Sequence, residues 1–279
     1  MSTFRVQAND RPRDEQLQRR RTFFLLTSRI YSSILLNSRV DEEKMHLLVV
    51  LTARNESMQT DEKRAFKNQL YEQFARLGKA LASPHRLELL DVLAQCERTV
   101  EALAQETGMS VANASQHLQV LRTAHLVEVR REGVSMYYRL ADEGVFKMWQ
   151  ALRTVGEAQL AEIDRVVQTF LHDRTRLQPM GAHELLHRLS DDQIILLDVR
   201  PAEEYAAGHL PQARSIPVTE LEARLAELPV NKEIVAYCRG PYCVFADEAV
   251  ALLRARGYQA HRLEEGLPDW RALGLPIEV

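Results

Sequence analysis

The spacing of apolar residues between positions 99 and 140 constrains the fold of this chain more than any other feature of its sequence. Thr99 and Ser110 can each cap a short amphipathic helix, and Gly108 lies where a left-handed residue can end the first of them. Beyond Leu121 the apolar residues alternate, and Gly133 is placed for a tight turn, which indicates a two-stranded hairpin. Two helices joined by a short turn and followed by a hairpin form a winged helix-turn-helix arrangement.

Helical patterns flank this arrangement. Apolar residues from Phe66 onward recur at helical spacing, and Ser83 followed by Pro84 marks the start of another helix. One long helical pattern covers about residues 142–172, and its length favours packing between two copies of the chain. We therefore predict a mainly α domain with dimerisation helices over 58–175.

From about residue 180 the pattern becomes an alternation of strands and helices. The apolar runs 193–199 and 233–238 are typical of strands buried on both faces, and 258–266 predicts a third strand. Helical patterns lie between them, which indicates a small parallel sheet. The predicted fold is thus two domains: a mainly α winged helix-turn-helix followed by an α/β domain over 176–279.

Residues 1–57 are predicted to be an extension that is disordered or results from a mis-assigned start codon. Arg29 and Arg39 interrupt its apolar stretch before the about 20 residues that a membrane helix needs. The net charge of -3 and three cysteines in the whole chain predict a cytoplasmic protein without a disulfide framework or a membrane partner.

The second helix of the pair and the hairpin carry side chains suited to DNA. Asn and Gln side chains can pair with adenine edges in a major groove, and arginines on a hairpin can reach phosphates or the minor groove. A polar face is also common on surface helices, so the prediction depends on the order of the elements. Double-stranded operator DNA is the predicted partner, bound by a homodimer at two half-sites. The predicted contact residues are Ser110, Asn113, Ser115, Gln116, His117, Arg122, Arg130, Arg131 and Arg139.

Residues 70–140 resemble the ArsR family of winged-helix repressors. The matching stretches are "LGKALASPHRLELLDVL", "TVEALAQETGMSVANASQHLQVLRTAHLV" and "VRREGVSMYYRL". The resemblance implies a homodimer whose operator affinity is altered by an effector. Metal-sensing members carry a Cys-x-Cys on the first helix of the pair, where this chain has Thr99 and Glu101. No metal and no cofactor are therefore expected, and Cys96 is expected to be a small, partly buried apolar residue.

A short loop after the second buried strand holds the other two cysteines. Cys238 ends the strand, Cys243 follows five positions later, and a helix begins near Val244. The carboxyl end of a parallel strand is where α/β sheets place active sites, and a loop entering a helix directs backbone N–H groups inward. With Arg239 beside it, Cys238 is predicted to have a lowered pKa and to act as a nucleophile. The predicted substrate-binding residues are Gly240, Pro241, Tyr242 and Val244.

This half of the chain resembles the rhodanese domain. The matching pieces are "ILLDVRPAEEYAAGHLPQARSIP", the loop and "LEEGLPDWRALGLPIEV". The resemblance implies that Cys238 carries a persulfide and that Asp198 and Arg200, with Glu204 and residues 209–211, support the site. Cys243 stands where rhodaneses usually have a small or hydroxyl residue. It either resolves the persulfide, as a disulfide or trisulfide with Cys238, or is a buried small residue at the start of the helix.

Three functions remain open at this point. The first is a transcriptional regulator that senses reactive sulfur or redox state through a persulfide on Cys238. The second is an active sulfurtransferase that takes sulfur from thiosulfate or a persulfide, with an attached DNA-binding domain. In the third, the rhodanese-like half only binds or dimerises. The first two require a small sulfur donor or acceptor as a partner.

Overall fold

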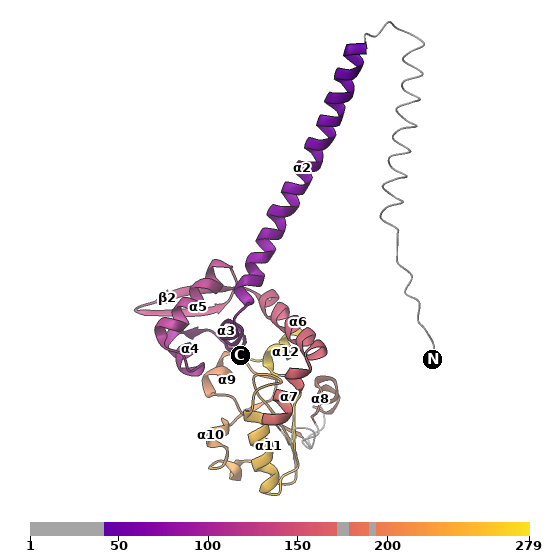
Figure 1. The fold of residues 1–279 in the computed structure, drawn as a ribbon. Helices are drawn as coiled ribbons and strands as arrows, with labels where there is room; N and C mark the ends of the chain where they lie inside the picture. Colours follow the sequence, from indigo (N-terminus) through magenta and orange to yellow (C-terminus); the bar gives the residue numbers. More distant parts are fainter. Residues whose placement is uncertain (1–41, 172–178, 190–193) are drawn as a thin grey trace, which may run out of the picture. The chain divides into compact units, whose positions relative to one another are not determined.

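The computed structural model describes residues 42–171, 179–189 and 194–279 (Figure 1). The chain divides into two compact units, residues 1–72 and 73–279. Helix α2 (Glu42–Leu81) is one continuous helix that includes the predicted boundary at residues 57 and 58. The extension is therefore helical from residue 42, and its first 41 residues lie outside the described part of the chain. Among the described residues, no helix is long and apolar enough to cross a membrane.

The predicted winged helix-turn-helix fold is confirmed. The Thr99 hydroxyl accepts a hydrogen bond from the Ala102 N–H, and Ser110 accepts one from Asn113, so both predicted caps form. Gly133 has φ of 60° in the hairpin turn, a conformation that glycine adopts without strain. The elements in chain order are α3 (Pro84–Leu93), β1 (Arg98–Thr99), α4 (Val100–Glu106), α5 (Val111–Thr123), β2 (Val127–Glu132) and β3 (Ser135–Leu140).

A third strand, β1, joins the hairpin and was not predicted. It pairs antiparallel with β3, and the sheet order is β1-β3-β2. The core beneath this sheet contains Leu103, Leu118 and Leu121, which are fully buried. Val111, the first residue of α5, is 46% exposed, so the buried face of this helix begins one turn later at Ala114.

The long helix predicted over 142–172 is two helices, α6 (Glu143–Gln159) and α7 (Ala161–Phe170). Leu160 leaves the helical region, with φ of -112° and ψ of 93°. The side chain of Ile163 on α7 packs against Gly156, where a Cβ would lie 3.1 Å from its Cδ1 atom. The missing side chain of Gly156 therefore lets α7 fold back against α6. No proline marks this break, which is why the helical pattern concealed it.

The C-terminal half is the predicted α/β fold. In the described part of this half, the sheet has four strands, all parallel, in the order β5-β4-β6-β7. The elements are α8 (Ala182–Arg188), β4 (Ile194–Asp198), α9 (Ala202–Ala207), β5 (Arg214–Ser215), α10 (Val218–Leu221), a 3₁₀ helix (Leu225–Glu227), β6 (Glu233–Tyr237), α11 (Phe245–Ala255), β7 (Ala260–Arg262) and α12 (Leu267–Ala272).

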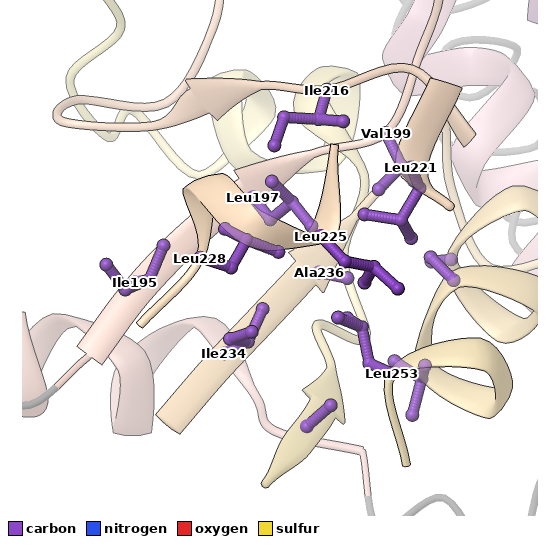
Figure 2. Packing of buried hydrophobic residues seen from close by; sticks show 14 of the residues in the cluster. Ile195, Leu197, Val199, Ile216, Leu221, Leu225, Leu228, Ile234, Ala236 and Leu253 are labelled. Carbon is purple, nitrogen blue, oxygen red and sulfur yellow. The ribbon is translucent and has the colours of Figure 1, made fainter. Parts of the chain in front are cut away.

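Both faces of this sheet are buried, as the continuous apolar runs predict. Figure 2 shows Leu197 and Ala236 on one face, packed with Leu253 of α11. Leu196 and Val235, the alternate residues of β4 and β6, pack on the other face in a second cluster. Because β4 and β6 are adjacent and parallel, Asp198 and Cys238 come to the same edge of the sheet.

Candidate functional site

Residues 238–244 connect β6 to α11 and enclose the sulfur of Cys238. Cys238 is only 2% exposed and belongs to the same hydrophobic cluster as Leu197, Ala236 and Leu253. Its Sγ atom lies 3.6 Å from the Cys243 carbonyl oxygen and 3.9 Å from that of Gly240. Carbonyl oxygens accept a hydrogen bond from a thiol and repel a thiolate, so these neighbours favour the protonated form of Cys238.

The structure reverses the predicted assignment of the thiolate. Burial raises the pKa of Cys238 well above its ordinary value, and the neighbouring Cys243 adds to this. The pKa of Cys243 is lowered to about 7 because the Cys238 thiol donates a hydrogen bond to its sulfur. Burial of Cys243 opposes this shift, and the backbone N–H groups of Arg239 and Phe245 reinforce it. Both shifts make Cys243 the more acidic of the two thiols in the reduced loop.

Arg239 was predicted to supply positive charge to Cys238; two carboxylates hold its guanidinium, and its charge contributes to the lowered pKa of Cys243 instead. Its Nε atom lies 3.0 Å from a carboxylate oxygen of Glu204, which is fully buried. Its Nη1 atom pairs with Glu106, the last residue of α4. This hydrogen bond is the main cause of the lowered pKa of Glu106. Arg239 therefore connects the loop to the helix-turn-helix.

A second arginine, Arg262 at the end of β7, fixes the other side of the loop and was missed by sequence reasoning. It donates to the carbonyl oxygens of Gly240 at 3.1 Å and Pro241 at 3.2 Å, and pairs with Asp247 at 3.3 Å. The only available signal was its register, because Arg262 stands opposite Ala236 two residues before Cys238.

Gly266 allows the loop to pack tightly against α12. A Cβ at Gly266 would lie 2.2 Å from the carbonyl oxygen of Arg239, so no side chain fits there. The nearby carboxylate of Asp269 accepts hydrogen bonds from Gln150 at 2.8 Å and from Arg153 at 2.5 Å, both on α6. Helix α6 therefore contacts the structure that supports the loop.

The predicted supporting residues form a buried network. Arg200 donates to Asp198 from Nε at 3.0 Å and from Nη2 at 2.6 Å, and Tyr237 donates to the same carboxylate at 2.6 Å. Asp198, Arg200 and Glu204 are all fully buried. Each charge has a partner, which is the condition under which buried ionised groups are tolerated.

Two residues of the winged-helix half reach into this network. Gln95 is 2% exposed, and its amide donates to the Arg239 carbonyl oxygen at 3.0 Å. The same amide accepts a hydrogen bond from Arg200 at 3.4 Å. Arg98, in β1, forms an ion pair with Glu204. Sequence reasoning missed Gln95, Arg98 and Glu106 because each lies more than 100 positions from its partner.

The predicted DNA-contact residues occupy the outer part of α5 and the hairpin. Ser110, Gln116 and Arg122 are exposed, whereas Asn113, Ser115 and His117 are half-buried. The His117 ring lies 5.3 Å from that of His85, and burial together with His85 lowers the pKa of His117.

The hairpin arginines are also paired. Arg130 contacts Glu97 at 2.8 Å and Glu132 at 2.5 Å, and Arg139 contacts Glu128 at 2.6 Å. Arg131 donates from Nε to the Gly133 carbonyl oxygen at 3.0 Å, within the turn. Because these pairs are solvent-exposed, phosphates can replace the carboxylates at little cost.

No group of three or more histidine, cysteine, aspartate or glutamate side chains is arranged to hold a metal ion among the residues that the structure describes. The cysteines Cys96, Cys238 and Cys243 are all free thiols.

Comparisons with known proteins agree with both halves of the fold. Residues 181–273 match the family described as Rhodanese-like domain, and residues 81–130 match the family described as Helix-turn-helix domain. The HTH-type transcriptional regulator Rv0324 of Mycobacterium tuberculosis is 46% identical over 220 residues, which cover 79% of this chain and 95% of that protein.

Other relatives match one half each. A protein named Sulfurtransferase from Allochromatium vinosum is 33% identical over 100 residues, covering 35% of this chain and 92% of that protein. A solution structure of a homodimeric winged helix-turn-helix DNA-binding domain from Mycobacterium bovis is 49% identical. It covers 34% of this chain and 87% of that fragment, with a TM-score of 0.33.

Proposed function

The chain belongs to the ArsR family of winged-helix transcriptional regulators and carries a C-terminal rhodanese domain, and on this premise we propose that it senses reactive sulfur. In this proposal a homodimer binds double-stranded operator DNA through α5 and the hairpin. A sulfane-sulfur donor converts Cys238 to a persulfide, and this modification changes the affinity for the operator.

The observation that supports this proposal best is the pairing of Arg239 with Glu106. Arg239 follows the reactive cysteine directly, and Glu106 ends α4, the first helix of the helix-turn-helix. Arg239 also contacts Glu204, which pairs with Arg98, just before α4 begins, and with Arg200. Directly and through Glu204, Arg239 is thus linked to both ends of α4. Helix α4 packs on α5, the helix proposed to enter the major groove.

The burial of Cys238 is a physical reason why a persulfide on this residue should change operator affinity. Cys238 belongs to a buried hydrophobic cluster, and densely packed interiors transmit displacements. An added sulfur atom must displace the loop, and Arg239 moves with the loop. The contacts favour a short path for this coupling through Arg239, Glu106 and Gln95.

The cysteine pair supplies the chemistry that this proposal requires. Cys243, whose pKa is lowered to about 7, is the more acidic thiol of the pair and accepts a hydrogen bond from the Cys238 thiol. Cys238 attacks the terminal sulfur of a donor R–S–SH while its proton moves to the Cys243 thiolate. The S–S bond of the donor breaks, R–S⁻ leaves, and Cys238 becomes a persulfide. Cys243 then loses this proton to solvent, and its thiolate attacks the Sγ atom of Cys238–S–SH, which forms a Cys238–Cys243 disulfide and releases the outer sulfur as HS⁻.

The test is a titration of the reduced protein with inorganic polysulfide, followed in parallel by mass spectrometry of the loop peptide and by binding to the DNA upstream of its gene. We expect a mass increase on Cys238 and a change in DNA affinity at the same polysulfide concentration. Mass addition to Cys238 with unchanged DNA binding would contradict the sensor function.

The similarity to a protein named Sulfurtransferase favours a second candidate, a working sulfurtransferase with an attached DNA-binding domain. Turnover of thiosulfate with cyanide as acceptor, abolished by Cys238→Ser, would support it. A persulfide that forms once and does not turn over favours the sensor.

A further inference from the structure

Arg262 lies on the same face of the sheet as Cys238. Side chains alternate between the two faces along a strand, and residues in register on neighbouring parallel strands share a face. Arg262 is in register with Ala236, which precedes Cys238 by two positions. Ala236 and Cys238 belong to one buried cluster with Ala260, which precedes Arg262 by two positions. The register therefore places the Arg262 side chain on the face where the Cys238 sulfur lies.

The contacts of Arg262 connect it to this sulfur through the loop. Its Nη2 atom donates to the carbonyl oxygens of Gly240 at 3.1 Å and Pro241 at 3.2 Å. The same Gly240 oxygen lies 3.9 Å from the Sγ atom of Cys238. One carbonyl oxygen thus contacts both the guanidinium and the sulfur. The positive charge of Arg262 thereby offsets the repulsion between this oxygen and a negative charge on the sulfur.

The guanidinium of Arg262 also retains an unused donor. Arg262 is 3% exposed, and its Nε atom has no hydrogen-bond partner among the described residues. This atom lies 3.3 Å from a carboxylate oxygen of Asp247 on α11, close enough for an ion pair but without a hydrogen bond. A buried donor without a hydrogen bond is costly, and an additional anion nearby reduces that cost. The reduced loop therefore leaves Arg262 able to stabilise one more negative charge.

The two arginines of the site act on different sulfurs. The pKa of Cys243 is lowered chiefly by the hydrogen bond from Cys238, and the charge of Arg239 adds to this shift. Burial and the neighbouring Cys243 raise the pKa of Cys238, and the charge of Arg262 opposes them. Other charged side chains near this end of the sheet form ion pairs with one another. These pairs are Arg239 with Glu204 and Glu106, and Arg200 with Asp198.

We propose that Arg262 is a positioning residue for the sulfur chemistry of this loop: its guanidinium, held by two loop carbonyl oxygens, supplies the positive charge that stabilises a sulfur anion on Cys238. That anion is first the attacking thiolate and then the persulfide Cys238–S–S⁻. This inference rests on the proposed persulfide function and identifies the residue on which its charge balance depends. Arg239 then links the loop to the helix-turn-helix, whereas Arg262 controls the charge on the reactive sulfur.

The test is a pH titration of the persulfide itself in the full chain with Cys243→Ser, where no second loop thiol can remove it. At alkaline pH the Cys238 thiol loses its proton to the solvent. The thiolate takes one terminal sulfur atom from inorganic polysulfide, and a polysulfide shorter by one sulfur atom leaves. Mass spectrometry confirms the added sulfur. An ionised persulfide absorbs in the near ultraviolet, so the difference in absorbance from the same protein reduced with dithiothreitol gives the midpoint of ionisation.

Arg262→Met in this background should raise the midpoint by about one pH unit, because the carboxylate of Asp247 remains near the sulfur without its cation. Arg262→Lys keeps the positive charge and should keep the midpoint near that of the chain with Cys243→Ser alone. Arg254→Met is the matched control. Arg254 also donates to a carbonyl oxygen of β7, that of Ala260 at 2.8 Å, but at the opposite end of the strand. Its midpoint should be unchanged.

A purely structural role of Arg262 predicts a shift of the opposite sign. If Arg262 only clamped the loop, Arg262→Met would loosen it and expose Cys238 to water. Because burial disfavours the charged form of a thiol or persulfide, this exposure would lower the midpoint.

Asp247→Asn examines the same charge without altering Arg262. It removes the carboxylate that neutralises Arg262 and should lower the midpoint by about half a pH unit. Glu248→Gln, at the exposed next position of α11, is its control and should leave the midpoint unchanged. Asp247→Asn keeps the proposal testable if Arg262→Met does not fold.

Three results would overturn the role of Arg262 and leave the sensor function standing. They are a midpoint that Arg262→Met leaves unchanged or lowers, an equal increase in Arg262→Lys, and a midpoint that Asp247→Asn leaves unchanged or raises. A persulfide that forms with Arg262→Lys but not with Arg262→Met would support the role. If inorganic polysulfide adds no sulfur to Cys238 in the wild type or with Cys243→Ser, the persulfide function itself fails, and the role of Arg262 with it.

Discussion

The hairpin and the sulfur loop both pair arginines with glutamates, but the two regions use these pairs differently. In the hairpin the side chain of Arg130 is 51% exposed, and its partner Glu132 is 64% exposed. In the loop Arg239 is 11% exposed, and its partner Glu204 is fully buried. An exposed pair contributes little to stability and can exchange its carboxylate for a DNA phosphate, whereas a buried pair cannot lose one partner without leaving a charge unpaired. The hairpin is therefore suited to reversible binding, and the loop to fixing the two halves of the chain together.

Removing the buried carboxylate of Glu204 should have the largest effect on stability. Glu204→Ala leaves Arg98 and Arg239 without their shared partner, and we expect it to lower the free energy of unfolding by about 3–5 kcal/mol. Glu128→Ala, which removes the exposed partner of Arg139, should cost less than about 1 kcal/mol. Urea denaturation of the two variants measures both changes in the free energy of unfolding. Equal decreases for Glu204→Ala and Glu128→Ala would contradict the distinction between the buried and the exposed ion pairs.

The second largest effect should come from replacing Cys243, which should slow the modification of Cys238. Because the pKa of Cys243 is about 7 and its thiolate accepts the proton of Cys238, modification of Cys238 should rise with pH through about 7 and level off above it. Cys243→Ser removes this base, so the rate at pH 7 should fall about a hundredfold and the rise should move to higher pH, following the raised pKa of Cys238. Mass spectrometry over pH 5–10 measures this profile.

Cys96→Ser is the matched control for that experiment, since Cys96 is a half-buried thiol outside the loop. Its profile should coincide with that of the wild type. A Cys243→Ser profile that also coincides with the wild type would show that Cys243 does not act as the base.

A single exposed arginine of the hairpin should have the smallest effect. Arg130→Ala should weaken binding about equally for operator and non-operator DNA and reduce the slope of log K against log salt by about one. Glu101→Ala, on the exposed part of α4, serves as the control. Fluorescence anisotropy across a salt series measures the slope, and an unchanged slope would exclude Arg130 from phosphate contact.

Local features of the sequence predicted the elements well because their causes are local. The caps at Thr99 and Ser110 and the turn at Gly133 depend on neighbouring residues, and all three form as predicted. The break at Leu160 was not predictable, because it depends on Ile163 packing against Gly156 instead of on a helix-breaking residue.

The sulfur loop shows the same limit more clearly. Its position at the end of β6 follows from the strand pattern, so Cys238 and Cys243 could be selected from the sequence alone. Which of the two thiols is more acidic could not be predicted, because it depends on the burial of Cys238 and on the hydrogen bond between the two sulfurs. The partners of Arg239 come from segments far away in the chain, and no spacing rule predicts such contacts.

The most direct test of the coupling between loop and DNA is the ratio of operator affinities before and after polysulfide treatment, measured for the wild type, Glu106→Gln and Glu101→Gln. Both variants remove one charge from α4, but only Glu106 contacts Arg239. The wild type and Glu101→Gln should show the same ratio, in the range of about 5–150-fold that is typical of allosteric coupling. In Glu106→Gln, polysulfide treatment should change the free energy of operator binding by less than half as much as in the wild type. An affinity ratio in Glu106→Gln equal to that of the wild type would contradict the proposed route.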